Sequence, residues 1–248
     1  GYLRATVDIN PKVKGKKLRT TYLLHPGKRY QIRRVNYDIQ DTAIAKLLNL
    51  ADSTTWGLQS GMSFNAENLD GERKRIVNEL TQNGYYHFSK DFISYKADSI
   101  AGTQWIDLTL VLHRFRNNHV KDAPHERYTM GDITYRSGNL EDSTIHLRPK
   151  VLRNNTFLES GKFYSSRHLQ ETYNHFGRLG AVRYTNISFK EHPEESVLDC
   201  DIAITTNKPS TISFQPEGTN TSGDLGAAAS LTYQNRNLFR GSETFSVQ

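Results

Sequence analysis

Two glycine-containing segments are the first candidates for chemistry, because glycine loops followed by Lys and Ser or Thr bind nucleotide phosphates. Residues 158–162 read LESGK, but residues 156–160 hold no upstream glycine, and Phe163 stands where the hydroxyl that meets magnesium would be. Residues 223–230 read GDLGAAAS and carry two of the three glycines that a dinucleotide loop needs. We therefore expect turn glycines in both segments and no nucleotide site.

Three histidines and a single cysteine are the candidates for a metal site or a nucleophile. His113, His119 and His125 recur every six residues, a spacing that matches no common zinc pattern, and the sequence holds no HExxH. Cys200 cannot form an intrachain disulfide and lies in an alternating apolar run, which favours a buried side chain over a reactive thiol. We expect solvated linker histidines, with no metal and no cofactor.

Adjacent carboxylates could supply general acid and base catalysis. Glu194 and Glu195 lie in the segment EHPEES, whose proline and polar residues are typical of a hairpin tip. The sequence also lacks the GxSxG motif of a serine nucleophile. We therefore expect no catalytic residue and a protein that is not an enzyme.

Composition limits the class of protein. The 248 residues are 36% apolar, and 13 Tyr, 11 Phe and 2 Trp can fill several small cores. No apolar run approaches the ~18–20 residues of a membrane-spanning helix. The net charge of +6 permits nucleic-acid binding, but the RNP1-like aromatic pattern of an RNA-binding sheet is missing. A basic nucleic-acid-binding module therefore stays only a distant alternative.

The elements that would position a site repeat along the chain. Apolar alternation in KRYQIRRVNYDI slips by one residue at Arg33 and Arg34, and the same slip returns in ERYTMGDITYR, where Tyr128 lies 98 positions after Tyr30. A broken alternation of this kind is typical of a β-bulge. In both copies two helices and two further strands follow. The sequence thus predicts two units of order strand–helix–helix–strand–strand.

Capping residues and glycines mark where the helices begin and end. Asp41 can accept the free amide hydrogens of a short first helix. Asn65 and Ser165 are the expected N-caps of the longer second helices. Gly84 and Gly180 follow these helices, where a residue of left-handed conformation is favoured.

The remaining elements show weaker and stronger patterns. Pro149 is expected to interrupt the short helix of the second copy. Before the first copy, two strands with Val7 and Leu18 flank a turn region at residues 11–17. The closing strands of both copies alternate cleanly and so predict one buried face each. Their apolar positions are Ile106, Leu108, Leu110 and Leu112, then Leu198, Cys200, Ile202 and Ile204.

This order of elements, with its G-x-x-[FY] openings, resembles the POTRA (polypeptide-transport-associated) domain of the BamA-type outer-membrane protein assembly family. The resemblance implies an α+β fold of tandem βααββ domains, each a three-stranded mixed sheet with two helices on one face. Complete domains would cover residues 27–114 and 126–207, joined by a polar linker at 115–125. Residues 1–26 would be the C-terminal part of a preceding repeat.

The C-terminal segment adds to this resemblance. From Leu225 to Tyr233, apolar and small or polar residues alternate, as in a transmembrane β-strand. The segment NRNLFRGSE is similar to a turn between early barrel strands of the family. The turn residues are Asn237, Leu238, Phe239, Gly241 and Glu243. Residues 208–248 would then be the first strands of a truncated outer-membrane β-barrel.

The resemblance also implies a function. The chain would lie mostly in the periplasm of a Gram-negative bacterium, capture unfolded β-barrel precursors and pass them to its barrel without a cofactor. Its partners would be these precursors, accessory assembly proteins and outer-membrane lipid through the barrel, with no nucleic acid. A TamA-like paralogue with other clients is the alternative.

In that family the second strand of each repeat is a sheet edge, to which an extended peptide can add as another strand. The matching residues are Phe88, Ser89, Lys90, Asp91, Phe92, Ile93, Ser94 and Tyr95 in the first copy, and Tyr184, Thr185, Asn186, Ile187, Ser188 and Phe189 in the second. Two alternatives stay open: the outward N–H groups belong either to Ser94 and Ser188 or to Ile93 and Ile187.

Overall fold

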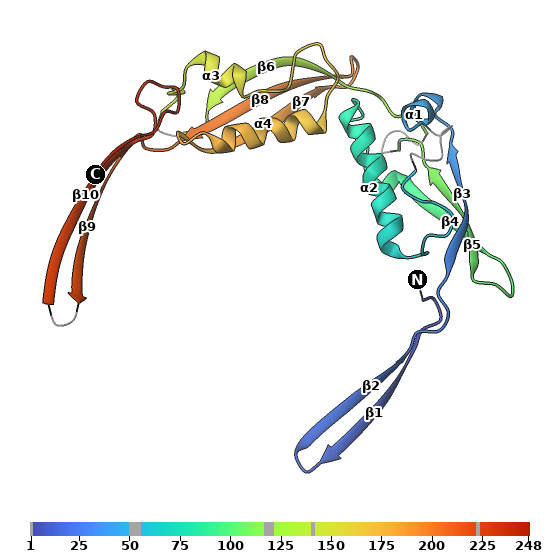
Figure 1. The fold of residues 1–248 in the computed structure, drawn as a ribbon. Coiled ribbons are helices and arrows are strands. Elements are labelled where there is room, and N and C mark those ends of the chain that lie inside the picture. The colour runs from blue at the N-terminus through green and yellow to red at the C-terminus, as the bar shows by residue number, and fades with distance from the viewer. Residues whose placement is uncertain (1, 50–55, 117–121, 140–141, 222–223) are drawn as a thin grey trace. The chain divides into compact units, whose positions relative to one another are not determined.

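The computed structural model describes residues 2–49, 56–116, 122–139, 142–221 and 224–248 (Figure 1). The chain divides into two compact units, Gly1–Thr81 with His87–His125 and Gln82–Tyr86 with Glu126–Gln248. Each unit contains a three-stranded sheet of mixed parallel and antiparallel pairing together with α-helices. The α+β class predicted from the sequence is confirmed.

The sheet of the first unit is built from β3 (Gln31–Ile39), β4 (Ile93–Ser99) and β5 (Trp105–Leu112) in the order β3-β5-β4. The central strand β5 is parallel to β3 and antiparallel to β4. The register of β3 shifts between Ile32 and Arg34, which confirms the bulge predicted from the broken alternation.

Two helices of the first unit begin at the expected caps. The side chain of Asp41 accepts two backbone N–H groups at the start of α1 (Thr42–Leu47), and that of Asn65 accepts one in the first turn of α2 (Ala66–Gln82). Gly84 follows α2 with a φ of 100°, in the left-handed region that glycine tolerates. These three predictions are confirmed.

The alternating face of β5 is the centre of the first core. Ile32, Leu58 and Leu108 form an apolar cluster, against which Leu69 of α2 packs. Burying one such side chain stabilises the fold by about 1.5–3 kcal/mol. The predicted buried positions Ile106, Leu108, Leu110 and Leu112 are all buried.

The second strand of the first unit begins later than the sequence suggested. Ser89 caps the short 3₁₀ turn η2 (Lys90–Phe92), which precedes β4. The rings of Phe88 and Phe92 pack on His125, with centroids 4.9 and 4.8 Å away. The prediction of an edge strand is therefore wrong for Phe88, Ser89, Lys90, Asp91 and Phe92, and β4 contains Ile93, Ser94 and Tyr95.

Two described residues near the ends of the expected polar linker are bonded to each other. The backbones of Phe115 and Ala123 exchange two hydrogen bonds of 2.9 and 3.1 Å. His125 is buried rather than solvated, so its expected linker role is wrong; His113 is exposed, and His119 lies outside the described residues.

The second unit repeats the sheet with β6 (Thr129–Ser137), β7 (Val182–His192) and β8 (Val197–Thr206) in the order β6-β8-β7. Here β8 is central, parallel to β6 and antiparallel to β7. A register shift between Met130 and Ile133 places a bulge where the second broken alternation predicted one. The four-residue turn between β7 and β8 contains the carboxylate pair, as expected of a hairpin tip.

The helices of the second unit begin differently from the prediction. Pro149 opens α3 (Pro149–Asn154) instead of interrupting it, because the first helical turn needs no N–H donor. Ser165 occupies the N-cap of α4 (Ser166–Arg178), but its side chain makes no capping hydrogen bond among the described residues. The position of this cap is confirmed, and its expected bond is absent there.

The end of α4 also departs from the prediction. Leu179 leaves the helix in an extended conformation with ψ of 119°, and its N–H bonds to the carbonyl of Phe176. Gly180 is not among the glycines of positive φ. The expected left-handed cap at Gly180 is therefore wrong, because the chain turns into β7 one residue earlier.

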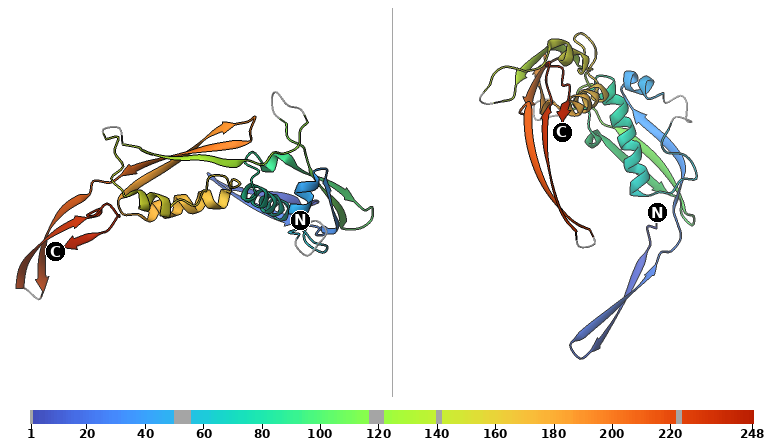
Figure 2. Two further views of the ribbon diagram at one scale, coloured as in Figure 1. Left: turned by 90° about the horizontal axis from the view of Figure 1, so that it is seen from above. Right: turned by 60° about the vertical axis from the view of Figure 1, so that its left-hand side comes forward.

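The core of the second unit lies between β8 and both helices. Leu152 of α3 and Phe176 of α4 join one buried cluster with the predicted apolar face of β8, so the helices cover the same face of the sheet; Figure 2 shows α4 running along it. That face consists of Leu198, Cys200, Ile202 and Ile204. Burial raises the pKa of the Cys200 thiol to about 12, as expected for a side chain that serves packing.

Two hairpins extend the units. The strands β1 (Thr6–Lys14) and β2 (Lys17–His25) are joined at Gly15, so the predicted turn region at residues 11–17 is too long: Pro11 lies within β1. No helix in the described part of the chain has the length and apolar character needed to cross a membrane.

The C-terminal strands form a separate antiparallel sheet of order β11-β10-β9. It consists of β9 (Ser210–Thr221), β10 (Asp224–Asn235) and β11 (Phe245–Val247). Gly226 pairs with Thr219 within the β9–β10 ladder, so the expectation of a turn glycine is wrong for Gly226; Gly223 lies outside the described residues, and Gly161 does lie in a turn.

Candidate functional site

The edge strand β4 exposes main-chain hydrogen-bonding groups. The carbonyl of Phe92 accepts from the N–H of His113 at 2.8 Å, which places this residue pair on the bonded side of the β4–β5 ladder. Because bonded and non-bonded pairs alternate in antiparallel sheets, Ser94 bonds to β5 as well. The N–H and C=O groups of Tyr95 and Ala97 therefore point away from β5, toward the open edge.

A groove runs beside this open edge. The Tyr95 hydroxyl donates to the carbonyl of Leu69 at 2.9 Å, and the guanidinium of Arg73 lies over the Tyr95 ring at 5.1 Å. The buried Nε of Arg73 has no hydrogen-bond partner among the described residues. The groove is lined by Ala66, Glu67, Leu69, Asp70, Arg73 and Tyr95. It thus combines one cation, two carboxylates, an aromatic wall and free main-chain groups.

The edge of β7 is occupied at the equivalent position. The N–H of Ile187 donates to the Tyr173 hydroxyl at 3.1 Å, and this hydroxyl lies 3.4 Å from the Ile187 carbonyl. Ile187 therefore points outward and Ser188 bonds to β8, which settles the alternatives for β7 in favour of isoleucine. Ile187 faces Ile202 as Tyr95 faces Leu110. One edge is open and the other is capped by α4.

All six residues predicted for the second edge lie in β7. In β4 the outward set includes Ile93, whose N–H is already bonded to the carbonyl of Lys90 in the 3₁₀ turn. The first open N–H of this edge is therefore that of Tyr95, the last residue of the predicted set.

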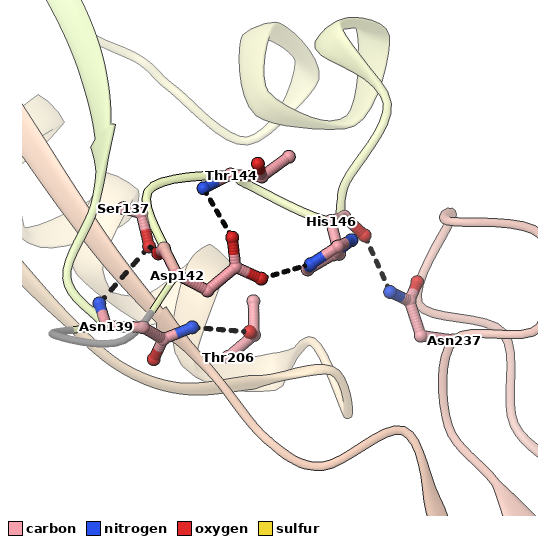
Figure 3. A network of polar contacts seen from close by, with 7 residues as sticks. All are labelled: Ser137, Asn139, Asp142, Thr144, His146, Thr206 and Asn237. Carbon is pink, nitrogen blue, oxygen red and sulfur yellow. Dashed lines mark hydrogen bonds and ion pairs between the residues drawn. The ribbon is translucent and has the colours of Figure 1, made fainter.

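The turn after β10 is bonded to the second unit. The Asn237 side chain donates to the His146 carbonyl at 2.6 Å, and the Arg148 guanidinium pairs with Glu243 at 2.7 Å. Figure 3 shows the Asn237 amide reaching toward His146. The Leu238 and Phe239 side chains are exposed. Of the predicted turn residues, polar ones hold the turn and apolar ones face outward.

Glu243 organises this turn by accepting backbone donors. The pKa of the Glu243 carboxyl is held below its ordinary value, most strongly by the residue's own backbone N–H. The N–H groups of Gly241 and Phe239 and the charge of Arg148 lower this pKa further. The hydroxyl of Ser242 accepts from the Ala181 N–H at 2.9 Å. The turn is thus fixed at both of its sides.

A small polar network lies next to the turn (Figure 3). The Asp142 carboxylate accepts from the Thr144 N–H at 2.8 Å and contacts His146 Nε2 at 2.5 Å. The backbone donor and then His146 hold the pKa of Asp142 below its ordinary value. Asn139 donates to the hydroxyl of Thr206 at 3.1 Å, which ties the loop to the end of β8.

Sequence reasoning missed a buried carboxylate in the first unit. Glu72 is 1% exposed and accepts from the Tyr37 hydroxyl at 2.7 Å, the Gly57 N–H at 3.0 Å and the Arg75 guanidinium at 2.8 and 2.7 Å. The contacts with Tyr37 and Gly57 join α2 to neighbouring elements, and Arg75 of the same helix balances the charge of the carboxylate. The missed signal is its position four residues before Ile76, on the apolar face of α2.

Within the described residues, no group of three or more His, Cys, Asp or Glu side chains could hold a metal ion. No family model matches the chain, and no curated protein matches it.

Solved structures match the fold. BamA from Haemophilus ducreyi lacking POTRA domains 1–3 aligns with 88% of this chain at a TM-score of 0.61 and 13% identity. The chain has the BamA-type POTRA fold. The BamA resemblance predicted from the sequence is thereby confirmed at the level of fold. This chain spans about a third of the length of that structure, covering 36% of it.

Two further solved structures align with most of this chain and are themselves covered to about three quarters. The POTRA3–5 structure of Haemophilus influenzae BamA covers 83% of this chain and is itself covered to 74%, with 14% identity and a TM-score of 0.49. The N-terminal domain of Omp85 from Thermosynechococcus elongatus covers 82% of the chain and is covered to 77%, with 13% identity and a TM-score of 0.35.

Proposed function

We propose that this chain is the periplasmic POTRA region of an outer-membrane protein assembly and insertion factor, and that it captures unfolded β-barrel precursors by strand addition. The observation that carries the proposal is the open edge of β4, where Tyr95 and Ala97 direct their main-chain groups outward beside the groove of α2. An extended peptide can bond there as a fourth strand.

Main-chain pairing suits a receptor for many precursors. Backbone groups are the same in every sequence, so affinity does not depend on the precursor's side chains. Each net hydrogen bond contributes about 0.5–1.5 kcal/mol, and two outward residues offer up to four bonds. The groove adds the Tyr95 ring, which favours aromatic side chains of the precursor, while the charge of Arg73 is offset by the carboxylates of Glu67 and Asp70. Weak, reversible capture follows.

The C-terminal strands support the membrane part of the proposal. The register places one apolar set on a single face of the β9–β10–β11 sheet, while the alternate positions are mostly polar or small. Strands of 12 residues exceed the ~9–11 needed to cross a bilayer. The exposed apolar set is Ile212, Phe214, Leu231, Tyr233, Phe245 and Val247. We propose that these strands begin a membrane β-barrel that receives the captured precursor.

A peptide titration followed by NMR tests the capture step. Two barrel-strand peptides of unrelated sequence should shift amides of β4, and Ala97→Pro should weaken both several-fold because one outward donor is lost. Thr185→Pro places proline outward on the capped β7 edge and is the matched control. Shifts confined to the helix faces, or binding that Ala97→Pro leaves unchanged, would refute capture at this edge.

A further inference from the structure

Cationic side chains gather where β9 and β10 leave the second repeat. Arg183, Lys208, Arg236 and Arg240 line one open cleft there. None of the four pairs with a carboxylate among the described residues, whereas the neighbouring Arg148 is paired with Glu243. The cleft therefore holds four positive charges that the described part of the protein does not neutralise.

The rest of the lining suits a phosphate more than a cation. Of the described lining residues, Asp142 alone is acidic, and its carboxylate is directed to Thr144 and His146 (Figure 3). The hydroxyl of Tyr184 lines the remaining wall, whereas the side-chain amide of Asn207 already donates to the carbonyls of Gly180 and Val182. Guanidinium groups bind phosphate oxygens in pairs, and hydroxyls add neutral donors.

The cleft adjoins an apolar surface. Pro209 and Thr211 of its wall lead directly into β9, and Arg236 follows the last residue of β10. Within three further residues of β9 lie Ile212 and Phe214, which are 70% and 64% exposed. Basic side chains at the base of an exposed apolar strand pair are the arrangement found where proteins meet lipid headgroups.

We infer that this cleft, the root cleft, binds the phosphate headgroup of an anionic membrane lipid. The inference rests on the proposed placement of β9 and β10 in the membrane. Seated there, the four basic residues meet the headgroup layer while the apolar face of the strands meets the acyl chains. A nucleic acid would share the phosphate chemistry but would leave the apolar face uncovered, so lipid is the occupant that both features favour.

Vesicle binding tests the root cleft. The chain is titrated with phosphatidylcholine vesicles that contain or lack phosphatidylglycerol, using a variant with glutamine at all four basic positions. Each Lys or Arg near an anionic surface contributes about fivefold in affinity, so binding to anionic vesicles should fall by roughly two to three orders of magnitude. The matched control loses the same charge on the β1–β2 hairpin and should bind nearly as well as the parent. Its substitutions are Lys12→Gln, Lys14→Gln, Lys17→Gln and Arg19→Gln.

Three outcomes would overturn the inference: equal loss in both variants, no preference for anionic vesicles, or tighter binding to duplex DNA than to vesicles. A fluorophore on Leu231→Cys, in a Cys200→Ser background, reports separately whether β10 enters the bilayer. If β10 inserts equally well in the parent and in the variant without the four cleft charges, the lipid site is refuted and the barrel proposal is retained. Absence of insertion refutes the barrel proposal itself.

Discussion

Replacing Tyr173 with phenylalanine tests whether its hydroxyl is what closes the β7 edge to peptides. The change removes only the hydroxyl that lies 3.1 Å from the Ile187 nitrogen and 3.4 Å from its carbonyl oxygen. Ile187 is 8% exposed as a residue, while its N–H points to the outer edge of the sheet, so water can replace the lost hydroxyl only in part. Leaving a buried donor unbonded costs about 1–3 kcal/mol, and the second contact is too long to add much. We expect the unfolding free energy of the second unit to fall by about 1–2 kcal/mol.

The same change should open the β7 edge. With its hydroxyl gone, Ile187 presents a free donor and acceptor, as Tyr95 does in β4. Barrel-strand peptides that shift only β4 amides in the parent should then also shift amides around Ile187. Denaturant unfolding measures the stability, and an NMR titration locates the binding.

Tyr135→Phe is the matched control, because its hydroxyl donates to Thr156 at 2.9 Å in the same unit but away from the edge. It should reduce stability by a similar amount without creating a binding site on β7. The reasoning is refuted if the β7 amides of Tyr173→Phe do not shift in the titration, or if the parent already binds peptide equally well on both edges.

The remaining predictions concern folding and titration. Glu72→Leu should destabilise the first unit by about 3 kcal/mol in denaturant unfolding, because its buried donors lose their acceptor. Gly84→Val should lower the melting temperature through its positive φ, whereas Gly180→Val should have little effect, and equal shifts would contradict this. Glu243 has a lowered pKa, so its stabilisation is complete above the ordinary value of 4.5 and is lost as pH falls through the lower folded value; turn amides followed by NMR should change only there. Cys200 should resist iodoacetamide at pH 8 until the protein unfolds.

The sequence predicted those features that local chemistry determines. Both bulges follow from where the apolar alternation breaks, and the buried faces of β5 and β8 follow from a period of two. The caps at Asp41 and Asn65 and the left-handed Gly84 depend on a few neighbouring atoms, so residue type was sufficient.

What escaped prediction depends on contacts between distant segments. A 3₁₀ turn replaces the start of the expected strand, and the rings of Phe88 and Phe92 pack there on His125, a partner that nothing in the local sequence indicates. Tyr173 lies on the apolar face of α4 by its helical spacing. The role of its hydroxyl at the β7 edge depends on the contact between α4 and Ile187, which local sequence does not indicate. The family resemblance implied the candidate edges, but not which of them is open.

Hydrogen exchange at the β4 edge tests the capture of precursor strands most directly. In the free chain the Tyr95 and Ala97 amides point outward and should exchange fast, while Lys96, which bonds to β5, should exchange slowly. A saturating barrel-strand peptide should slow Tyr95 and Ala97 at least tenfold and leave Ile187, already bonded to Tyr173, unchanged. If both amides stay fast at saturation, the precursor does not add to β4 and the account of capture is contradicted.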